Sequence, residues 1–326
     1  MSPDSLLTDS LISYLTMPDF HYGGQAVMEG VMMRGQRHVA VAVRAPNGEI
    51  VLHQEPLNAA IYTSPASRLP FVRGLVMLWD MLVLGVRTLM FSANIALAEE
   101  DTQLTTPMII GTVLLSLGLV LGLFFLAPLL IVSLADRFIA SSLASNLVEG
   151  AIRILFVLAY IAAMGFLPDI RRVFAYHGAE HKTINAYEAG ATLEPATVQT
   201  YSTAHPRCGT SFLLWVLVIA VFVFALFGRP SMPVRIASRL LLVPVLASVC
   251  YEILKLGANY FHLRPVRWLF APALVVQSLT TRQPDESMIE VAIASLKQVL
   301  RADGVLAPEP VPQTPQTPGF SEKPGV

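Results

Sequence analysis

The chain has 326 residues, of which 54% are hydrophobic and only 14% are charged, against about 25% charged residues in soluble domains. This composition, with a mean hydropathy of +0.59, indicates an α-helical integral membrane protein whose main partner is the lipid bilayer. The net charge of −1 and the lack of Lys/Arg-rich runs argue against a nucleic-acid partner.

The amino-terminal region precedes the apolar segments. Residues 1–20 form a tail without Lys or Arg, so we predict no cleaved signal peptide and insertion through internal spans. In residues 21–66, short apolar runs alternate with turn residues, which predicts a small β unit. Within this unit, the runs His38–Arg44 and Glu49–His53 flank Asn47-Gly48, a pair typical of a hairpin turn.

A glycine-rich segment, 23–35, opens the β unit and carries Gln25, Glu29 and Arg34. Glycines let a backbone approach a partner closely, and an acid five residues from an arginine can serve a site as base and anion holder. Glu29 is therefore a candidate catalytic base, with Gln25 and Arg34 as candidate binding residues. The alternative is a glycine-bent strand with a solvent-exposed ion pair.

Residues 67–104 are predicted to form an amphipathic helix. Polar residues recur every seven positions from Arg73 to Asp101 along an otherwise apolar sequence. Seven residues make about two turns, so these side chains form one stripe, which suits a helix in the membrane interface or packed against a bundle. The alternative is a fifth spanning helix with paired interior charges, which would invert the side of the amino-terminal region.

A bundle of about four transmembrane helices is predicted over residues 105–282. Glu149 and Arg153 lie in one span and can pair at i,i+4, whereas another span crosses only if Arg239 and Lys255 reach the interface. The predicted spans are 107–135, 147–167, 209–228 and 234–256.

The distribution of positive charge orients the bundle. With four spans, both terminal regions and the polar segment 168–208 share one side, and that side holds most of the Arg and Lys residues. By the positive-inside rule this side is cytoplasmic, and we expect the protein in the cell (plasma) membrane. The apolar run 268–281 is too short to cross and is predicted to be interfacial or re-entrant.

The carboxy-terminal region, 283–304, is predicted to form an amphipathic helix capped by Asp285, because apolar residues recur at i, i+3, i+4 and i+7. The tail 305–326 is rich in Pro, Gln and Thr, which predicts disorder.

His177, Glu180 and His181 lie in the polar segment, on a predicted helix from Arg171 to Ala189. Histidines four residues apart project from one helix face and can share a metal. The order His-x-x-Glu-His also occurs in inverzincin metallopeptidases, in which the glutamate is the general base, so Glu180 is a candidate catalytic residue. The alternative is that these histidines anchor the chain at the membrane interface.

A second pair of donors, His205 and Cys208, follows in the same segment, stiffened by Pro206. We expect Cys208 to be a free thiol, because Cys250 lies inside a hydrophobic run. Imidazole and thiolate donors favour zinc first and iron second. Four ligands would make the metal structural, whereas three ligands and an open position would make it catalytic.

Several motifs resemble the YqhQ-like family of bacterial membrane proteins. The motifs are Gly-Gly-Gln-Ala-Val-Met-Glu-Gly-Val-Met-Met-Arg-Gly at 23–35, Leu-Pro-Phe-Val-Arg-Gly at 69–74, Tyr-His-Gly-Ala-Glu-His-Lys-Thr at 176–183 and His-Pro-Arg-Cys-Gly-Thr-Ser-Phe at 205–212. The resemblance implies a multi-pass membrane protein and a predicted metal-dependent enzyme with ligands at His177, His181, His205 and Cys208. It implies neither a substrate nor a reaction.

These features lead to three functional hypotheses. The first is a metal-dependent hydrolase that acts on a lipid-linked molecule or a membrane protein, with Glu180 or Glu29 activating water. The second is a non-catalytic scaffold or assembly factor with a structural metal site. Transport is the weakest hypothesis, because the sequence indicates few buried ionisable residues within the spans.

Overall fold

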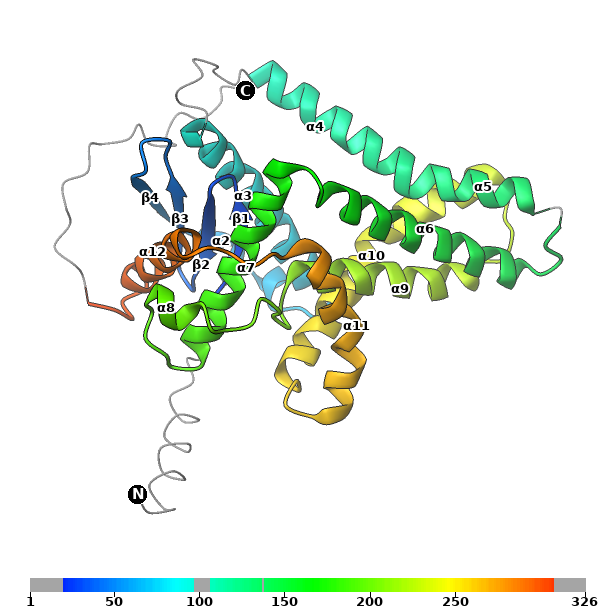
Figure 1. Ribbon diagram of the computed structural model, residues 1–326. Coiled ribbons are helices and arrows are strands. Elements are labelled where there is room, and N and C mark those ends of the chain that lie inside the picture. The colour runs from blue at the N-terminus through cyan, green and yellow to red at the C-terminus, as the bar shows by residue number, and fades with distance from the viewer. Residues whose placement is uncertain (1–19, 97–105, 137, 308–326) are drawn as a thin grey trace.

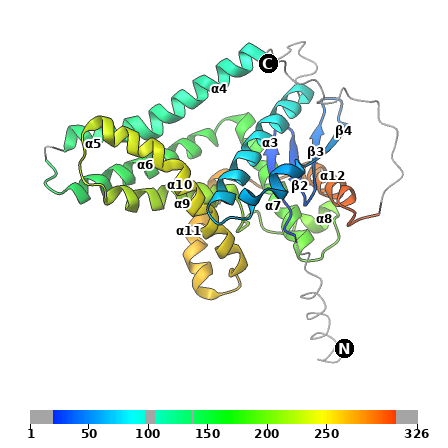
Figure 2. The ribbon, with the colours of Figure 1, turned by 180° about the vertical axis from the view of Figure 1, so that it is seen from behind.

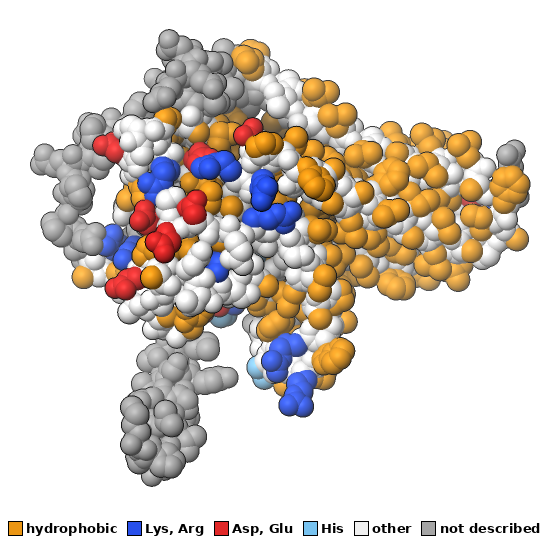
Figure 3. Space-filling model, in the orientation of Figure 1, with side chains coloured by type: hydrophobic (Ala, Val, Ile, Leu, Met, Phe, Trp, Pro, Cys, Tyr) orange, Lys and Arg blue, Asp and Glu red, His pale blue; other side chains and the backbone are white. Residues whose placement is uncertain are grey.

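The computed structural model describes residues 20–96, 106–136 and 138–307. An elongated helical bundle extends from a part of the chain that contains a small β-sheet (Figures 1 and 2). Hydrophobic side chains cover the bundle, whereas charged side chains gather over the sheet-containing part (Figure 3). The predicted tails, except residue 20 and residues 305–307, lie outside the described residues, as do the last residues of the predicted amphipathic helix 67–104.

The sheet has four antiparallel strands in the order β1-β2-β3-β4. The predicted hairpin is confirmed as β3 and β4. The glycine-rich segment forms the other two strands, joined by a turn, rather than one bent strand. Val27 pairs with Gly30, so Met28 and Glu29 form a two-residue turn in which Glu29 has a φ of 50°. The strands are β1 (Gly23–Val27), β2 (Gly30–Arg34), β3 (His38–Arg44) and β4 (Ile50–Pro56).

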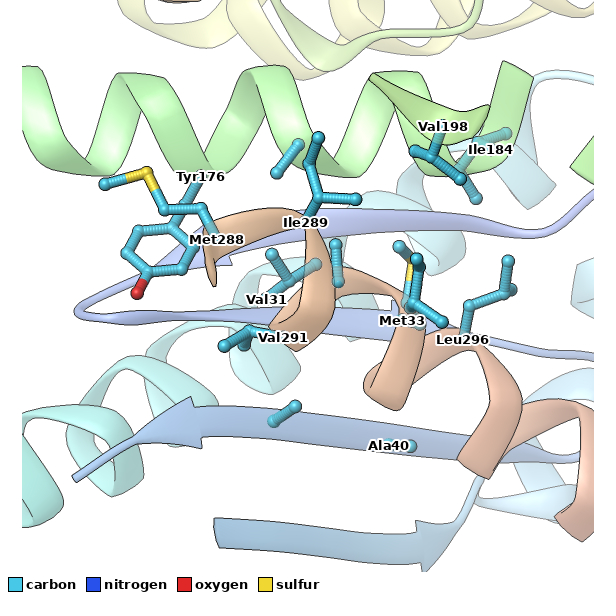
Figure 4. Close-up of a cluster of buried hydrophobic side chains, with 14 of the residues drawn as sticks. Val31, Met33, Ala40, Tyr176, Ile184, Val198, Met288, Ile289, Val291 and Leu296 are labelled. Atoms are coloured by element: carbon cyan, nitrogen blue, oxygen red, sulfur yellow. The ribbon is translucent and has the colours of Figure 1, made fainter. Parts of the chain in front are cut away.

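Helices cover both faces of the sheet. Successive side chains of a strand point to opposite faces, so each strand contributes apolar side chains to both. Val31 and Met33 pack against α7 (Pro168–Glu188) and α12 (Glu286–Ala302), as Figure 4 shows. Met32 lies on the other face, in a cluster with Leu84 of α3 (Val72–Ala96). The contacts on the first face hold α7 against the sheet, and α7 carries the predicted metal motif.

Helix α12 confirms the prediction for the carboxy-terminal region. The Asp285 carboxylate accepts a hydrogen bond from the Met288 N–H at 2.9 Å, as an N-cap does. Past its end, the buried Asp303 carboxylate accepts the N–H groups of Gln36 and Arg37. These bonds tie the end of α12 to the β2–β3 turn.

The bundle consists of helices that pack along one another (Figure 1). A π-helical turn, Gly122–Leu126, joins its first two helices. The helices are α4 (Thr106–Leu121), α5 (Ala127–Ala135), α6 (Ser142–Met164), α9 (Gly209–Ala225), α10 (Met232–Asn259) and α11 (Arg264–Thr280). Short helical segments elsewhere are α2 (Ala59–Thr63), η1 (Pro65–Ser67) and α8 (Pro195–Val198).

Within residues 20–96, 106–136 and 138–307, four helices are long and apolar enough to cross a membrane, which agrees with the predicted number, although the set differs. Three of the four overlap predicted spans, and the fourth is α3. The predicted span 209–228 corresponds to α9, which has 17 residues and is shorter than the others. Two residues of the polar stripe of α3 face the protein: Arg73 pairs with Glu252 of α10, and Asp80 accepts a hydrogen bond from Tyr62. The opposite side of α3 exposes large apolar residues such as Trp79. Leu84 of the same helix packs on the sheet, so α3 fits the prediction of a helix packed against the rest of the protein, and it fits a span by length and hydropathy alone.

Charged side chains lie buried between α6 and α10. Glu149 bonds Arg153, Arg235 and Arg239 at 2.7–3.0 Å, and all four side chains are at most 4% exposed. The predicted Glu149–Arg153 pair is confirmed. The expectation that Arg239 reaches the interface is wrong. Glu149 neutralises Arg239 within the bundle, and this arrangement costs less free energy than extending the arginine side chain through lipid. Buried ionisable groups are also more numerous than the sequence indicated.

Candidate metal centre

Three of the predicted ligands meet where the sheet-containing part joins the bundle. His177 and His181 project from one face of α7, and Cys208 is the N-cap residue of α9. One ligand atom from each of the three lies within 4.8 Å of the others. A tetrahedral zinc site spaces its ligand atoms by roughly 3.4–3.8 Å, given Zn–N of about 2.0 Å and Zn–S of about 2.3 Å. The cluster therefore needs to contract by only about 1 Å to hold such an ion.

Backbone carbonyls orient both imidazoles. His177 Nδ1 lies 2.9 Å from the carbonyl oxygen of Thr280, and His181 Nδ1 lies 2.6 Å from that of Thr203. A carbonyl oxygen only accepts, so each Nδ1 carries the proton and each Nε2 presents its lone pair. Metal-binding histidines in proteins use this arrangement, since the second hydrogen bond fixes both tautomer and ring orientation.

The thiol of Cys208 completes the cluster. Its Sγ lies 3.2 Å from His177 Nε2, and the side chain is a free, buried cysteine, as is Cys250, so the predicted absence of a disulfide is confirmed for the described residues. Gln277 of α11 fixes the turn before it, because its amide bonds both the N–H and the carbonyl of His205, at 3.0 and 2.7 Å. The turn therefore holds Cys208 opposite α7.

His205 lies beside the cluster rather than within it. Its ring centroid is 5.6 Å from that of His181, and its Nε2 is 3.6 Å from a Glu188 carboxylate oxygen. Burial lowers the pKa of His205 below the usual value, although Glu188 partly opposes this effect. His205 is thus a neutral imidazole, and whether it binds a metal stays a prediction.

Glu180 is the carboxylate nearest to the cluster. Its Oε2 lies 4.0 Å from His177 Nε2, and its side chain is 8% exposed. Burial raises the pKa of Glu180, while His177 and the backbone N–H of Gly24 oppose the rise. A Cβ atom on Gly24 would stand 2.3 Å from the backbone oxygen of Met32 and 3.2 Å from Glu180 Cγ, so glycine lets β1 approach both β2 and Glu180. The position fits a base beside a metal.

The other predicted site residues lie away from the cluster. Glu29 forms a double ion pair with Arg172 at 2.6 and 2.5 Å, about 12 Å along α7 from Glu180 at 1.5 Å per residue. Gln25 lies against Gly85 of α3 on the opposite face of the sheet from α7. Arg34 lies on that opposite face too, with its Cζ 5.0 Å from the ring centre of Tyr62. The structure does not bring these three residues to the metal ligands.

Several groups that support the ligands could not be predicted from the sequence. These are the carbonyls of Thr203 and Thr280, the amide of Gln277 and the backbone of Gly24. Backbone carbonyls leave no signal in a sequence. Gln277, however, is a single amide in an apolar run, and such a residue is often buried with a specific partner.

Comparison with known proteins places the chain in a family. Residues 69–302 match the family model described as "Protein of unknown function (DUF1385)". The chain belongs to this family. It is also 30% identical over 297 residues to the "Uncharacterized protein YqhQ" of Bacillus subtilis (strain 168), a match that covers 87% of this chain and 93% of that protein. No solved structure matches the chain. The resemblance to YqhQ-like proteins is therefore confirmed.

Proposed function

We propose that this protein is a metal-dependent hydrolase of the cell membrane, with zinc as the metal and iron as the second choice. The observation that carries the proposal is the cluster of His177, His181 and Cys208, in which both histidines present Nε2 because carbonyls hold Nδ1. Three protein ligands leave a position open, as catalytic zinc sites do. When bound, zinc acts as a Lewis acid and lowers the pKa of water.

Glu180 is the proposed general base. In hydrolysis, water adds its oxygen to the electrophilic centre of the substrate, one proton passes to the base, and the leaving group receives that proton as its bond breaks. Glu180 is buried within 4.0 Å of His177, and its raised pKa suits a carboxylate that must accept a proton and release it. Gly24 holds the carboxylate in place through its N–H.

The membrane setting supports a membrane-bound substrate. Cys208 is the N-cap residue of α9, an apolar helix of the bundle, so the cluster lies at the end of that helix. The substrate is then a lipid-linked molecule or a membrane protein. With the four spans predicted from the sequence, in which α3 does not cross, the positive-inside rule supports a cytoplasmic position for the cluster and both termini.

One observation favours the second hypothesis, a scaffold with a structural metal. His205 is buried, its Nε2 lies beyond hydrogen-bond distance of any described partner, and its ring is 5.6 Å from that of His181. A small movement would make it the fourth ligand and close the site.

Substitutions separate the two hypotheses. For a hydrolase, Glu180→Gln retains the metal and the yield of folded protein but fails to complement a strain that lacks the gene, while His205→Ala retains the metal. For a scaffold, Glu180→Gln complements fully. The single variants His177→Ala, His205→Ala and Cys208→Ala each lose both the metal and the abundance of folded protein. Metal content by mass spectrometry and complementation are the two measurements. Glu194→Gln is the matched control, because Glu194 lies outside the cluster at the start of α8.

A further inference from the structure

Residues 199–204 cross one face of α7 before the chain turns towards Cys208. Positions i, i+3, i+4 and i+7 of a helix lie on the same face, and here they are Gly178, His181, Lys182 and Asn185. A Cβ atom on Gly178 would stand 3.3 Å from the side chain of Thr203, so the segment lies close against the helix. The polar side chains of this face can therefore reach the backbone of the segment.

Lys182 binds the first half of the segment. Its ammonium group donates to the carbonyl oxygens of Gln199 and Tyr201, each at 2.6 Å. Lys182 is 3% exposed, and among the residues that the structure describes it forms no ion pair. A buried ammonium group without a counter-charge costs free energy, which an apolar side chain of the same length would avoid. The advantage of lysine at this position is therefore its hydrogen bonding to the two carbonyls.

Asn185 binds the second half of the segment. Its side-chain amide donates to the carbonyl oxygens of Ser202 and Ala204, at 2.8 and 3.1 Å. The carbonyl between these two belongs to Thr203, and its oxygen lies 2.6 Å from His181 Nδ1. Asn185 thus holds both neighbours of the carbonyl that orients one of the candidate metal ligands.

We propose that Lys182 and Asn185 are positioning residues of the metal centre. They hold residues 199–204 in register with α7, and this register places the Thr203 carbonyl at His181 Nδ1. Without that acceptor, a neutral imidazole can carry its proton on either nitrogen, and a proton on Nε2 removes the lone pair that binds a metal. Loss of a group that orients a metal-binding histidine typically weakens metal binding by about 10–100-fold.

His177 provides an internal comparison. Its Nδ1 lies 2.9 Å from the carbonyl oxygen of Thr280, at the end of α11, and the hydrogen bonds of Lys182 and Asn185 go to residues 199–204 instead. A general loosening of the fold would release both histidines. Loss of the register between α7 and the segment is expected to release His181 alone.

The inference rests on the proposed metal site and names two residues that set its affinity. The tautomer of His181 is nevertheless a property of the metal-free chain. It can therefore be measured whether or not the protein is an enzyme.

Solid-state NMR of the metal-free full chain in lipid bilayers, with isotope-labelled histidine ring nitrogens, measures this tautomer. The pH is held at about 8, above the usual imidazole pKa of about 6.5. The signals of His177 and His181 are assigned from their loss in His177→Gln and His181→Gln. In the wild type, both rings are expected to carry the proton on Nδ1.

Lys182→Met and Asn185→Leu remove the donors with little change in side-chain size. Each is expected to give a mixture of His181 tautomers, to leave His177 protonated on Nδ1, and to weaken Zn²⁺ binding by about 10–100-fold in competition with a chelator. Asn185 is only half-buried, so Asn185→Leu still tests the inference if Lys182→Met lowers the yield. The matched controls, which are expected to change neither measurement, are Lys255→Met and Asn259→Leu, at exposed positions of α10.

Three results would overturn the inference. In the first, His181 keeps its proton on Nδ1 in both variants. In the second, His177 and His181 change together, which indicates a general loosening of the fold. In the third, both variants bind Zn²⁺ as tightly as a wild type that binds it. If His181 alone changes but the wild type binds no Zn²⁺, the positioning of His181 by Lys182 and Asn185 stands, whereas the proposed hydrolase fails.

Discussion

Removing the charge of Glu149 is expected to cost the bundle much of its stability. Glu149 is 1% exposed and bonds Arg153, Arg235 and Arg239 at 2.7–3.0 Å. Glu149→Gln leaves the size of the side chain unchanged but deprives three buried guanidinium groups of their shared anion. Breaking a buried ion pair by removing one partner costs about 3–5 kcal/mol. At about 1.4 kcal/mol per factor of ten, the unfolding equilibrium shifts by roughly 100-fold to several thousand-fold.

Reversible unfolding by SDS in mixed micelles measures this loss, with the helical circular dichroism signal as the readout. The matched control is Glu290→Gln, because Glu290 pairs with Arg44 on the surface and its side chain is 51% exposed. Exposed pairs contribute about 0–1 kcal/mol. If the free energy of unfolding of Glu149→Gln lies within about 1 kcal/mol of the values for the wild type and this control, burial of the three arginines does not depend on Glu149.

Three further predictions concern single sites. Asp285→Ala destabilises α12 by about 1 kcal/mol in chemical unfolding, whereas Asp285→Asn retains the cap. Burial opposes the effect, but hydrogen bonds lower the pKa of Asp285 below its ordinary value of 3.8. The stabilisation by this carboxylate is therefore present above that pH and is lost as the pH falls below it, and Asp285→Asn lacks this pH dependence. Gly178→Ala lowers metal content, because a Cβ atom there would meet the backbone oxygen of Arg282; Gly118→Ala, with open space around it, leaves metal content unchanged. Glu29→Gln retains the metal and complements, since its ion pair is on the surface, and loss of either would return Glu29 to the site.

Local patterns in the sequence predicted much of the fold. The Asn-Gly turn predicted β3 and β4, the Asp285 cap predicted α12, and hydrophobic length predicted the number of apolar helices. Whether α3 belongs among those helices was open, because a polar stripe can face either water or another part of the protein. Only tertiary contacts, such as the Arg73–Glu252 ion pair, show that part of the stripe faces the protein.

Local patterns also predicted part of the candidate site. Spacing on one helix predicted His177 and His181, and a nearby thiol predicted Cys208. Only the structure shows that Glu29 lies away from the metal ligands, because sequence distance does not reveal that its turn lies beside Arg172. The carbonyl of Thr280 likewise reaches His177 only because α11 ends against α7.

Cobalt substitution of the purified full chain tests whether His177, His181 and Cys208 form a metal site with an open position. We expect one Co²⁺ per chain, with a thiolate-to-cobalt absorption band that disappears in Cys208→Ala and persists in Glu180→Gln. Spectra in the visible range should show tetrahedral coordination that changes when an external anion occupies the open position. If the chain binds no cobalt, or if the thiolate band persists in Cys208→Ala, these residues do not form the proposed site.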